Sequence, residues 1–213
     1  MIPVKVLASR VIANAAAGLR MGLGAPVGYP SLGLFTTDCD DATYIALDAA
    51  TKAAEVEIVY GRSFYAGAAN ASTPNAGEVI GILAGATPGA VKSGMEAAVS
   101  ALSRVGFEEV GGVPYLAHTV SSVGSYLAKE AGVRQGSAIA YLIAPPLESM
   151  YAMDAALKAA DVKLCKLYSP PSETNFGGGL LSGTQSACDA ACAAFAVAVA
   201  EVAGRPKERE YGI

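Results

Sequence analysis

The feature that most constrains this chain is a ten-residue segment that occurs twice. Residues 48–57 read Asp-Ala-Ala-Thr-Lys-Ala-Ala-Glu-Val-Glu, and residues 154–163 read Asp-Ala-Ala-Leu-Lys-Ala-Ala-Asp-Val-Lys. Seven of the ten positions are identical, at an offset of 106 in a chain of 213 residues. Because the similarity extends beyond this segment, a duplicated fold explains it better than chance likeness between two alanine-rich helices. The chain is therefore predicted to hold two similar domains of about 100 residues each.

Each copy has the pattern of a helix that is followed by a strand. Residues at helical spacing occupy matching places, namely Tyr44, Leu47, Thr51 and Ala54 in the first copy and Met150, Met153, Leu157 and Ala160 in the second. Apolar residues then alternate with polar ones, at Val56, Ile58 and Tyr60 and again at Val162 and Leu164. The first spacing predicts one helical face and the second a half-buried strand.

The remaining elements repeat in the same order. In the first half, strands are predicted over 4–12, 31–36, 55–60 and 77–84, and helices over 14–21, 40–54 and 88–102, with Asn14 as a possible cap. In the second half, strands are predicted over 115–121, 137–144, 161–167 and 179–182, and helices over 124–131, 146–160 and 186–203. We expect domains over 1–106 and 107–213, joined by a compact glycine-rich linker. Strands and helices in this order indicate the α+β class.

Composition excludes several classes of function. A net charge of −4 argues against nucleic acid, whose binding requires a basic face. The longest uninterrupted apolar run is only 190–200, well short of the ~18 residues that span a bilayer, so no membrane segment and no secretory signal are expected. Charged residues make up 16% and hydrophobic residues 53%, which predicts extensive buried or interfacial surface.

The cysteines and the single histidine do not form a metal-binding pattern. With His118 as the only histidine, a Cys/His zinc site within one chain is not expected, and the four cysteines are interpreted as small buried thiols. His118 itself is more typical of a satisfied core or surface side chain than of a ligand. The chain also has no phosphate loop, nucleophile elbow or metal-ligand spacing.

Three carboxylates gather where the second helix begins, at Asp38, Asp40 and Asp41. Helix capping and the helix dipole explain one or two of them, but not all three. The positions 106 residues later hold Ala144, Pro146 and Leu147. Because both copies begin a helix and only one carries this charge, a role beyond capping stays open.

Several longer motifs resemble those of one protein family. They are Asp38-Cys-Asp-Asp-Ala-Thr-Tyr44, Val59-Tyr-Gly-Arg-Ser-Phe-Tyr-Ala-Gly-Ala68, Gly77-Glu-Val, Gly124-Ser-Tyr-Leu, Ala144-Pro-Pro-Leu-Glu148, Pro171-Ser-Glu-Thr-Asn175 and Gln185-Ser-Ala-Cys188. Together with the repeat, they cover nearly the whole chain. The sequence resembles the tandem-domain shell proteins of bacterial microcompartments, in particular the L-type shell proteins of ethanolamine-utilisation compartments.

The resemblance implies a structural role without catalysis or cofactor. It implies two tandem, circularly permuted bacterial microcompartment (BMC) domains, each with a sheet related to the ferredoxin-like fold and flanking helices. It further implies that three chains form a pseudohexagonal homotrimer. Such trimers join other shell proteins edge to edge in the bacterial cytoplasm and carry a gated central pore for metabolites.

The resemblance also assigns roles to particular residues. Lys52 and Lys158 match lysines at the edge where tiles meet, although two solvated helix lysines would show the same pattern. Asp40, Asp41 and Glu78 match positions that line a small acidic pore and receive ethanolamine.

Tyr65 and Phe107 match aromatics that close the central pore, although ordinary packing of aromatic side chains is the alternative. Two rival functions are also kept. One is a small-amine-binding enzyme that uses Asp40, Asp41, Glu78 and His118 for acid–base chemistry, and the other is a soluble regulatory trimer that binds an amine.

Overall fold

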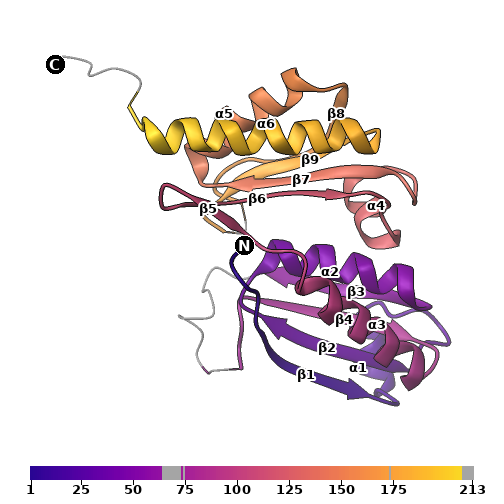
Figure 1. The fold of residues 1–213 in the computed structure, drawn as a ribbon. Coiled ribbons are helices and arrows are strands. Elements are labelled where there is room, and N and C mark those ends of the chain that lie inside the picture. The colour runs from indigo at the N-terminus through magenta and orange to yellow at the C-terminus, as the bar shows by residue number, and fades with distance from the viewer. Residues whose placement is uncertain (64–72, 74, 173, 208–213) are drawn as a thin grey trace. The chain divides into compact units, whose positions relative to one another are not determined.

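The structure is a computed structural model that describes residues 1–63, 73, 75–172 and 174–207. Its first half contains β1 (Val6–Ile12), α1 (Ala17–Gly22), β2 (Ser31–Thr37), α2 (Asp40–Ala53), β3 (Val56–Ser63), β4 (Val79–Gly85) and α3 (Pro88–Leu102) (Figure 1). Its second half contains β5 (Glu108–Val110), β6 (Val113–Val120), α4 (Ser125–Ala131), β7 (Ala138–Ala144), α5 (Pro146–Ala159), β8 (Val162–Tyr168), β9 (Gly177–Gly183) and α6 (Gln185–Gly204). Apart from β5, the second half repeats the order of the first.

The chain forms two compact units. The N-terminal unit comprises 3–106 and 123–136, and the C-terminal unit comprises 1–2, 107–122 and 137–213. Residues 123–136, which carry α4, thus pack with the unit formed by the other half of the sequence.

Each unit is built on one antiparallel sheet, and the two sheets have matching strand orders. The order is β1-β2-β4-β3 in the N-terminal unit and β5-β6-β7-β9-β8 in the C-terminal unit. The middle strands are mostly apolar, which fits strands that are covered on both faces, and β7 is buried at every position. The duplicated fold predicted from the sequence is therefore present, with two α+β sheets of one topology.

Alternating residues of the N-terminal sheet face two different layers. Gly33 and Gly81 face the helices, because a Cβ on Gly33 would lie 2.6 Å from Met95 Sδ of α3 and one on Gly81 would lie 2.8 Å from Leu47 of α2. Missing side chains thus let α2 and α3 approach the sheet closely. The opposite face of the sheet carries Leu32, Ile82 and Ala84. These residues pack against the segment that follows α1, which includes Leu23, Ala25 and Tyr29.

The C-terminal unit has its core between its sheet and α5 and α6. Phe195 and Cys188 of α6 are fully buried there, with Leu142 and Leu181 of the sheet. In the part of the chain that the structure describes, α6 is the one helix whose length and composition would allow it to cross a membrane. Because its buried face belongs to this core cluster, α6 has the packing of a core helix.

Two local expectations were wrong. Asn14 does not cap α1, because the N-cap is Ala16 and no side chain caps it. The compact linker over 108–114 is in part a hairpin, in which β5 pairs with β6 across Gly111 and Gly112. Both glycines have positive φ, 58° and 83°, as a two-residue hairpin turn of this hand requires.

Candidate functional site

The candidate site lies where β2 ends and α2 begins. Cys39 is the N-cap of α2 and lies in the extended conformation. The buried hydroxyls of Thr37 and Thr43 share a hydrogen bond of 2.7 Å, and Thr43 also donates to the carbonyl of Cys39 at 2.7 Å. These hydroxyls satisfy backbone groups that the turn would otherwise leave unpaired, so the start of α2 is held firmly.

The three aspartates at this turn have different surroundings. Asp38 Oδ1 accepts the backbone N–H of Lys5 at 2.7 Å and so holds the segment before β1. Asp40 Oδ1 accepts the N–H of Asp41 at 2.8 Å, within the first turn of α2. Asp40 and Asp41 are each only 8% exposed. The helix dipole favours negative charge at this end, which offsets part of the cost of burying two carboxylates.

Glu78 reaches the same place from the segment just before β4. Its backbone N–H donates to the carbonyl of Thr37 at 2.7 Å. Gly77 makes this approach possible, because its φ is 74° and a Cβ there would lie 2.9 Å from the same carbonyl. The backbone conformation of Gly77 thus places the carboxylate of Glu78 beside the start of α2.

Burial and repulsion between like charges raise pKa values in this cluster. Burial, and after it the negative charges of Asp40 and Asp38, together raise the pKa of Glu78 to about 7. Burial is also the main reason why the pKa of the Cys39 thiol is raised. The negative charges of Asp41, Asp40 and Glu78 raise this pKa by smaller amounts. Cys39 therefore stays a neutral thiol. The arrangement gathers several carboxylates at one place, which favours a small cation with N–H donors.

The structure thus brings together the carboxylates that the sequence singled out. Asp40, Asp41 and Glu78 all lie close enough to Cys39 to act on its titration. Among the described residues, no group of three or more His, Cys, Asp or Glu side chains is arranged to hold a metal ion. His118 lies on β6, which belongs to the C-terminal unit, whereas the three carboxylates belong to the N-terminal unit.

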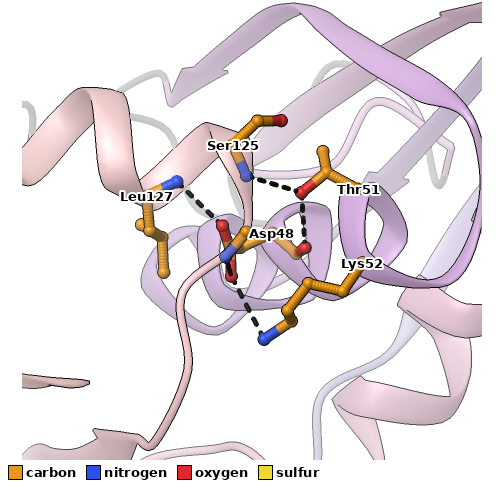
Figure 2. Close-up of polar contacts among 6 residues, drawn as sticks. Asp48, Thr51, Lys52, Ser125 and Leu127 are labelled. Carbon is orange, nitrogen blue, oxygen red and sulfur yellow. Dashed lines mark hydrogen bonds and ion pairs between the residues drawn. The ribbon is translucent and has the colours of Figure 1, made fainter. Parts of the chain in front are cut away.

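A second polar centre joins α2 to α4 within the N-terminal unit (Figure 2). Asp48 is fully buried, and its carboxylate accepts the backbone N–H groups of Gly124 at 2.8 Å and Leu127 at 2.9 Å. Thr51 Oγ1 accepts the N–H of Ser125 at 3.1 Å. Side chains of α2 therefore satisfy the free N–H groups at the start of α4.

The two lysines of the repeat lie in unequal surroundings. Lys52 Nζ lies 3.2 Å from the buried carboxylate of Asp48, and its side chain is 37% exposed. Lys158 Nζ lies 2.6 Å from Asp154, in a pair whose side chains are 74% and 63% exposed. Both ammonium groups reach the surface, which is what a contact at a tile edge needs.

Of the two aromatic residues proposed for a gate, the structure describes only Phe107. Phe107 is half-buried, and its ring lies 5.7 Å from the ring of Phe176 within the C-terminal unit. Its carbonyl accepts the N–H of Ile2. Tyr65 lies outside the described residues.

Sequence reasoning missed Asp48 and Cys39 as site-forming residues. A signal for Asp48 was present, because a carboxylate at the centre of an otherwise apolar, repeated helix face needs a partner. Nothing in the sequence identified α4 as that partner, since 76 residues separate Asp48 from Gly124.

Comparison with known proteins agrees with this fold. The model of the BMC domain family matches residues 31–113. The bacterial microcompartment shell protein EutL of Clostridium perfringens (strain 13 / Type A) is 58% identical over 205 residues, which cover 94% of each chain. A crystal structure of the ethanolamine utilization protein EutL from Leptotrichia buccalis C-1013-b is 55% identical, with a TM-score of 0.94 over 98% of both chains. The trimeric microcompartment shell protein PduB shares the fold, with a TM-score of 0.79 at 19% identity over 94% of this chain and 89% of that chain.

The duplicated sheet and the matched BMC domain define a tandem-domain microcompartment shell protein, which is a structural class and not an enzyme class. Within that class, the identity over nearly the full length decides the assignment. The chain belongs to the EutL family of bacterial microcompartment shell proteins.

Proposed function

We propose that this chain is a tile of an ethanolamine-utilisation microcompartment shell in the bacterial cytoplasm. One observation carries the proposal: a single chain holds two copies of one sheet topology, and the first copy matches the BMC domain. Three such chains supply six similar units, enough for a closed pseudohexagonal ring. PduB, which shares the fold, is described as trimeric.

The expected assembly is a homotrimer that joins other shell proteins edge to edge. Lys52 and Lys158 would lie at these edges, where a long stem with three donors can bond the carbonyls of a neighbour. Light scattering on the purified chain should give about three times 21.4 kDa, and electron microscopy should show flat hexagonal sheets. A stable monomer at micromolar concentration would overturn this architecture.

We further propose that the cluster of Asp40, Asp41 and Glu78 receives a small primary ammonium such as ethanolamine. Three carboxylates near one point, with a pKa of about 7 at Glu78, favour a bound cation that restores the ionised state. An ammonium offers three donors and fits carboxylate acceptors. A charge-assisted hydrogen bond contributes ~1.5–3 kcal/mol, so two or three of them, less the cost of ordering, suggest a Kd of roughly millimolar.

The pH dependence of binding tests this site. The ammonium binds ionised Glu78, so binding lowers the pKa of this carboxyl and releases a proton below pH 7. Affinity should rise about tenfold from pH 6 to pH 8, because the ionised fraction of a group with a pKa of about 7 rises by that factor. Isothermal titration calorimetry with ethanolamine, in two buffers of different ionisation heat, measures both quantities.

Matched variants separate this site from nonspecific attraction. Asp40→Asn with Glu78→Gln should abolish the heat and the proton release. Glu96→Gln, which removes an exposed carboxylate of α3, should leave both unchanged. Equal heats in the wild type and the double variant would rule the site out.

The central pore is proposed to be gated by Phe107 and Tyr65. On a three-fold axis, one aromatic per chain becomes a ring of three that can close a channel by contact and by dewetting. An amine would shift this gate only if it bound one state more tightly than the other. Crystal structures of the trimer with and without ethanolamine would locate both side chains and test the coupling.

A further inference from the structure

One hydroxyl at the end of the N-terminal sheet has no hydrogen-bond partner. Ser63, the last residue of β3, is half-buried, and its Oγ is buried. In the part of the chain that the structure describes, Ser63 Oγ and Arg20 Nε are the two buried side-chain polar atoms without a partner. A buried hydroxyl that makes no hydrogen bond costs free energy, so such a group in a folded protein calls for an explanation.

The strand register places Ser63 next to the segment that carries Glu78. Strands β2 and β3 both pair antiparallel with β4, so they run in the same direction and end together. Thr37 and Ser63 are both paired with Val79, one on each side of it. Glu78 directly precedes Val79, and neighbouring strands lie about 5 Å apart. The hydroxyl without a partner is therefore close to the acidic cluster.

The Ser63 side chain faces the helix layer in which α2 begins. Gly61 faces this layer, because a Cβ there would lie 3.5 Å from Leu47 of α2. Residues two apart on a strand share a face, so Ser63 faces it as well. Thr37 at the end of β2 also faces this layer, since its hydroxyl shares a hydrogen bond with that of Thr43. The Thr37 hydroxyl thus has a partner at this end of the unit, whereas the Ser63 hydroxyl has none.

The carboxylates and the hydroxyl offer a ligand two different kinds of partner. Asp40 begins α2 three residues after Thr37, and its charge acts on Glu78. Ionised carboxylates only accept hydrogen bonds, and they pair best with a charged donor such as an ammonium. A serine hydroxyl is neutral and can both donate and accept, so a neutral hydroxyl suits it.

This combination narrows the chemical class of the ligand. An amino acid would bring a carboxylate that Asp40, Asp41 and Glu78 repel. A simple alkylamine would satisfy the carboxylates but leave the hydroxyl of Ser63 buried without a partner. A short amino alcohol carries an ammonium at one end and a hydroxyl at the other, and it can satisfy both.

We infer that Ser63 recognises the hydroxyl group of a short amino alcohol whose ammonium is bound by Asp40, Asp41 and Glu78. The inference deepens the proposed amine site and rests on it. The carboxylates supply the affinity that every small primary ammonium shares. Ser63 adds the difference in affinity between an amino alcohol and an alkylamine of the same size, and this difference is the specificity of the site.

Calorimetry with ethanolamine and propylamine tests this role. The two amines have the same number of heavy atoms and differ by a hydroxyl in place of a methyl group. At pH 8, above the pKa of about 7 of Glu78, the wild type should bind ethanolamine about three- to tenfold more tightly, as one neutral hydrogen bond allows. Ser63→Ala should lower the affinity for ethanolamine to that for propylamine and leave propylamine binding unchanged. A preference that survives in Ser63→Ala would overturn the inference.

Two controls separate recognition from a structural role. Ser93→Ala, which removes an exposed hydroxyl of α3, should keep the full preference for ethanolamine. In urea unfolding without amine, Ser63→Ala should be at least as stable as the wild type, because it removes a buried hydroxyl that has no partner. A clear loss of stability would show that the fold itself uses this hydroxyl, and the inference would then be wrong.

The wild type in the same experiment distinguishes two failures. If neither amine binds the wild type, the proposed amine site is wrong, and the role of Ser63 is wrong with it. If both amines bind the wild type equally and the carboxylate variants abolish binding, the amine site stands and Ser63 does not recognise a hydroxyl.

Discussion

Replacing Asp48 by alanine should detach α4 from α2 and destabilise the N-terminal unit. The carboxylate is fully buried and accepts two backbone N–H groups, at 2.8 and 2.9 Å, beside Lys52 at 3.2 Å. The variant would leave the N–H groups of Gly124 and Leu127 without their acceptor, where a lost hydrogen bond to a charged group costs ~1.5–3 kcal/mol. Because water can reach part of the vacated site, we expect a total loss of about 3–4 kcal/mol.

The neighbouring lysine should matter much less. Lys52 is 37% exposed, and its removal leaves both N–H groups on Asp48. Lys52→Ala should therefore cost about 1 kcal/mol or less. Asp48→Asn keeps one acceptor oxygen and should lie between the two variants, which preserves the test if Asp48→Ala does not fold.

Two measurements report on this prediction. Urea unfolding gives the total loss, and hydrogen exchange of the amides in 124–131 reports the opening of α4 alone. Asp189→Ala is the matched control, because Asp189 is exposed on α6 and its replacement should leave exchange in α4 unchanged. The reasoning is refuted if Asp48→Ala unfolds within about 0.5 kcal/mol of the wild type and its α4 amides exchange no faster.

Three further predictions follow from the candidate site. Glu78 has a folded pKa of about 7 against an ordinary 4.5, so its protonated form favours folding and stability should fall as pH rises between these values. For this half-buried group we expect ~1–2 kcal/mol after solvent screening, and Glu78→Gln should remove that slope in urea titrations at pH 5 and 8. Lys52→Ala with Lys158→Ala should leave the trimer intact but abolish ordered sheets in electron microscopy, and sheets of wild-type order would contradict the edge assignment. Phe107→Ala should raise the passage of a small solute through assembled shells, and unchanged passage would count against the gate.

Much of the fold follows from periodicity. The expected helix over 146–160 and the expected strand over 137–144 match α5 and β7 to within a residue, because a regular apolar spacing and a proline at the helix start fix both. The hairpin of β5 and β6 could also have been predicted from the sequence. Val110-Gly-Gly-Val113 is a two-residue turn signal that a reading of the segment as linker overlooked.

The packing of α4 was beyond local reasoning. Its sequence predicts a short helix correctly, but its location in the N-terminal unit depends on Asp48 and Thr51, more than 70 residues earlier. The acidic cluster was predictable in part for a different reason. Asp40 and Asp41 are adjacent in sequence, whereas Glu78 joins them only because β4 lies beside β2 in the sheet and Gly77 admits a tight approach.

The duplication also limits how many amines each chain should bind. The first repeat places Asp40, Asp41 and Glu78 around the start of α2, whereas the residues 106 positions after the two aspartates are Pro146 and Leu147. Aligning Gly85 with Gly183 places Phe176, which packs on Phe107, at the position of Glu78. The second repeat thus lacks carboxylates at these three positions and has only Glu148 in the first turn of α5, so it does not repeat the cluster that would accept an ammonium. Calorimetry should therefore give one ethanolamine per chain, and a stoichiometry of two would show that the carboxylates of the first repeat do not define the site.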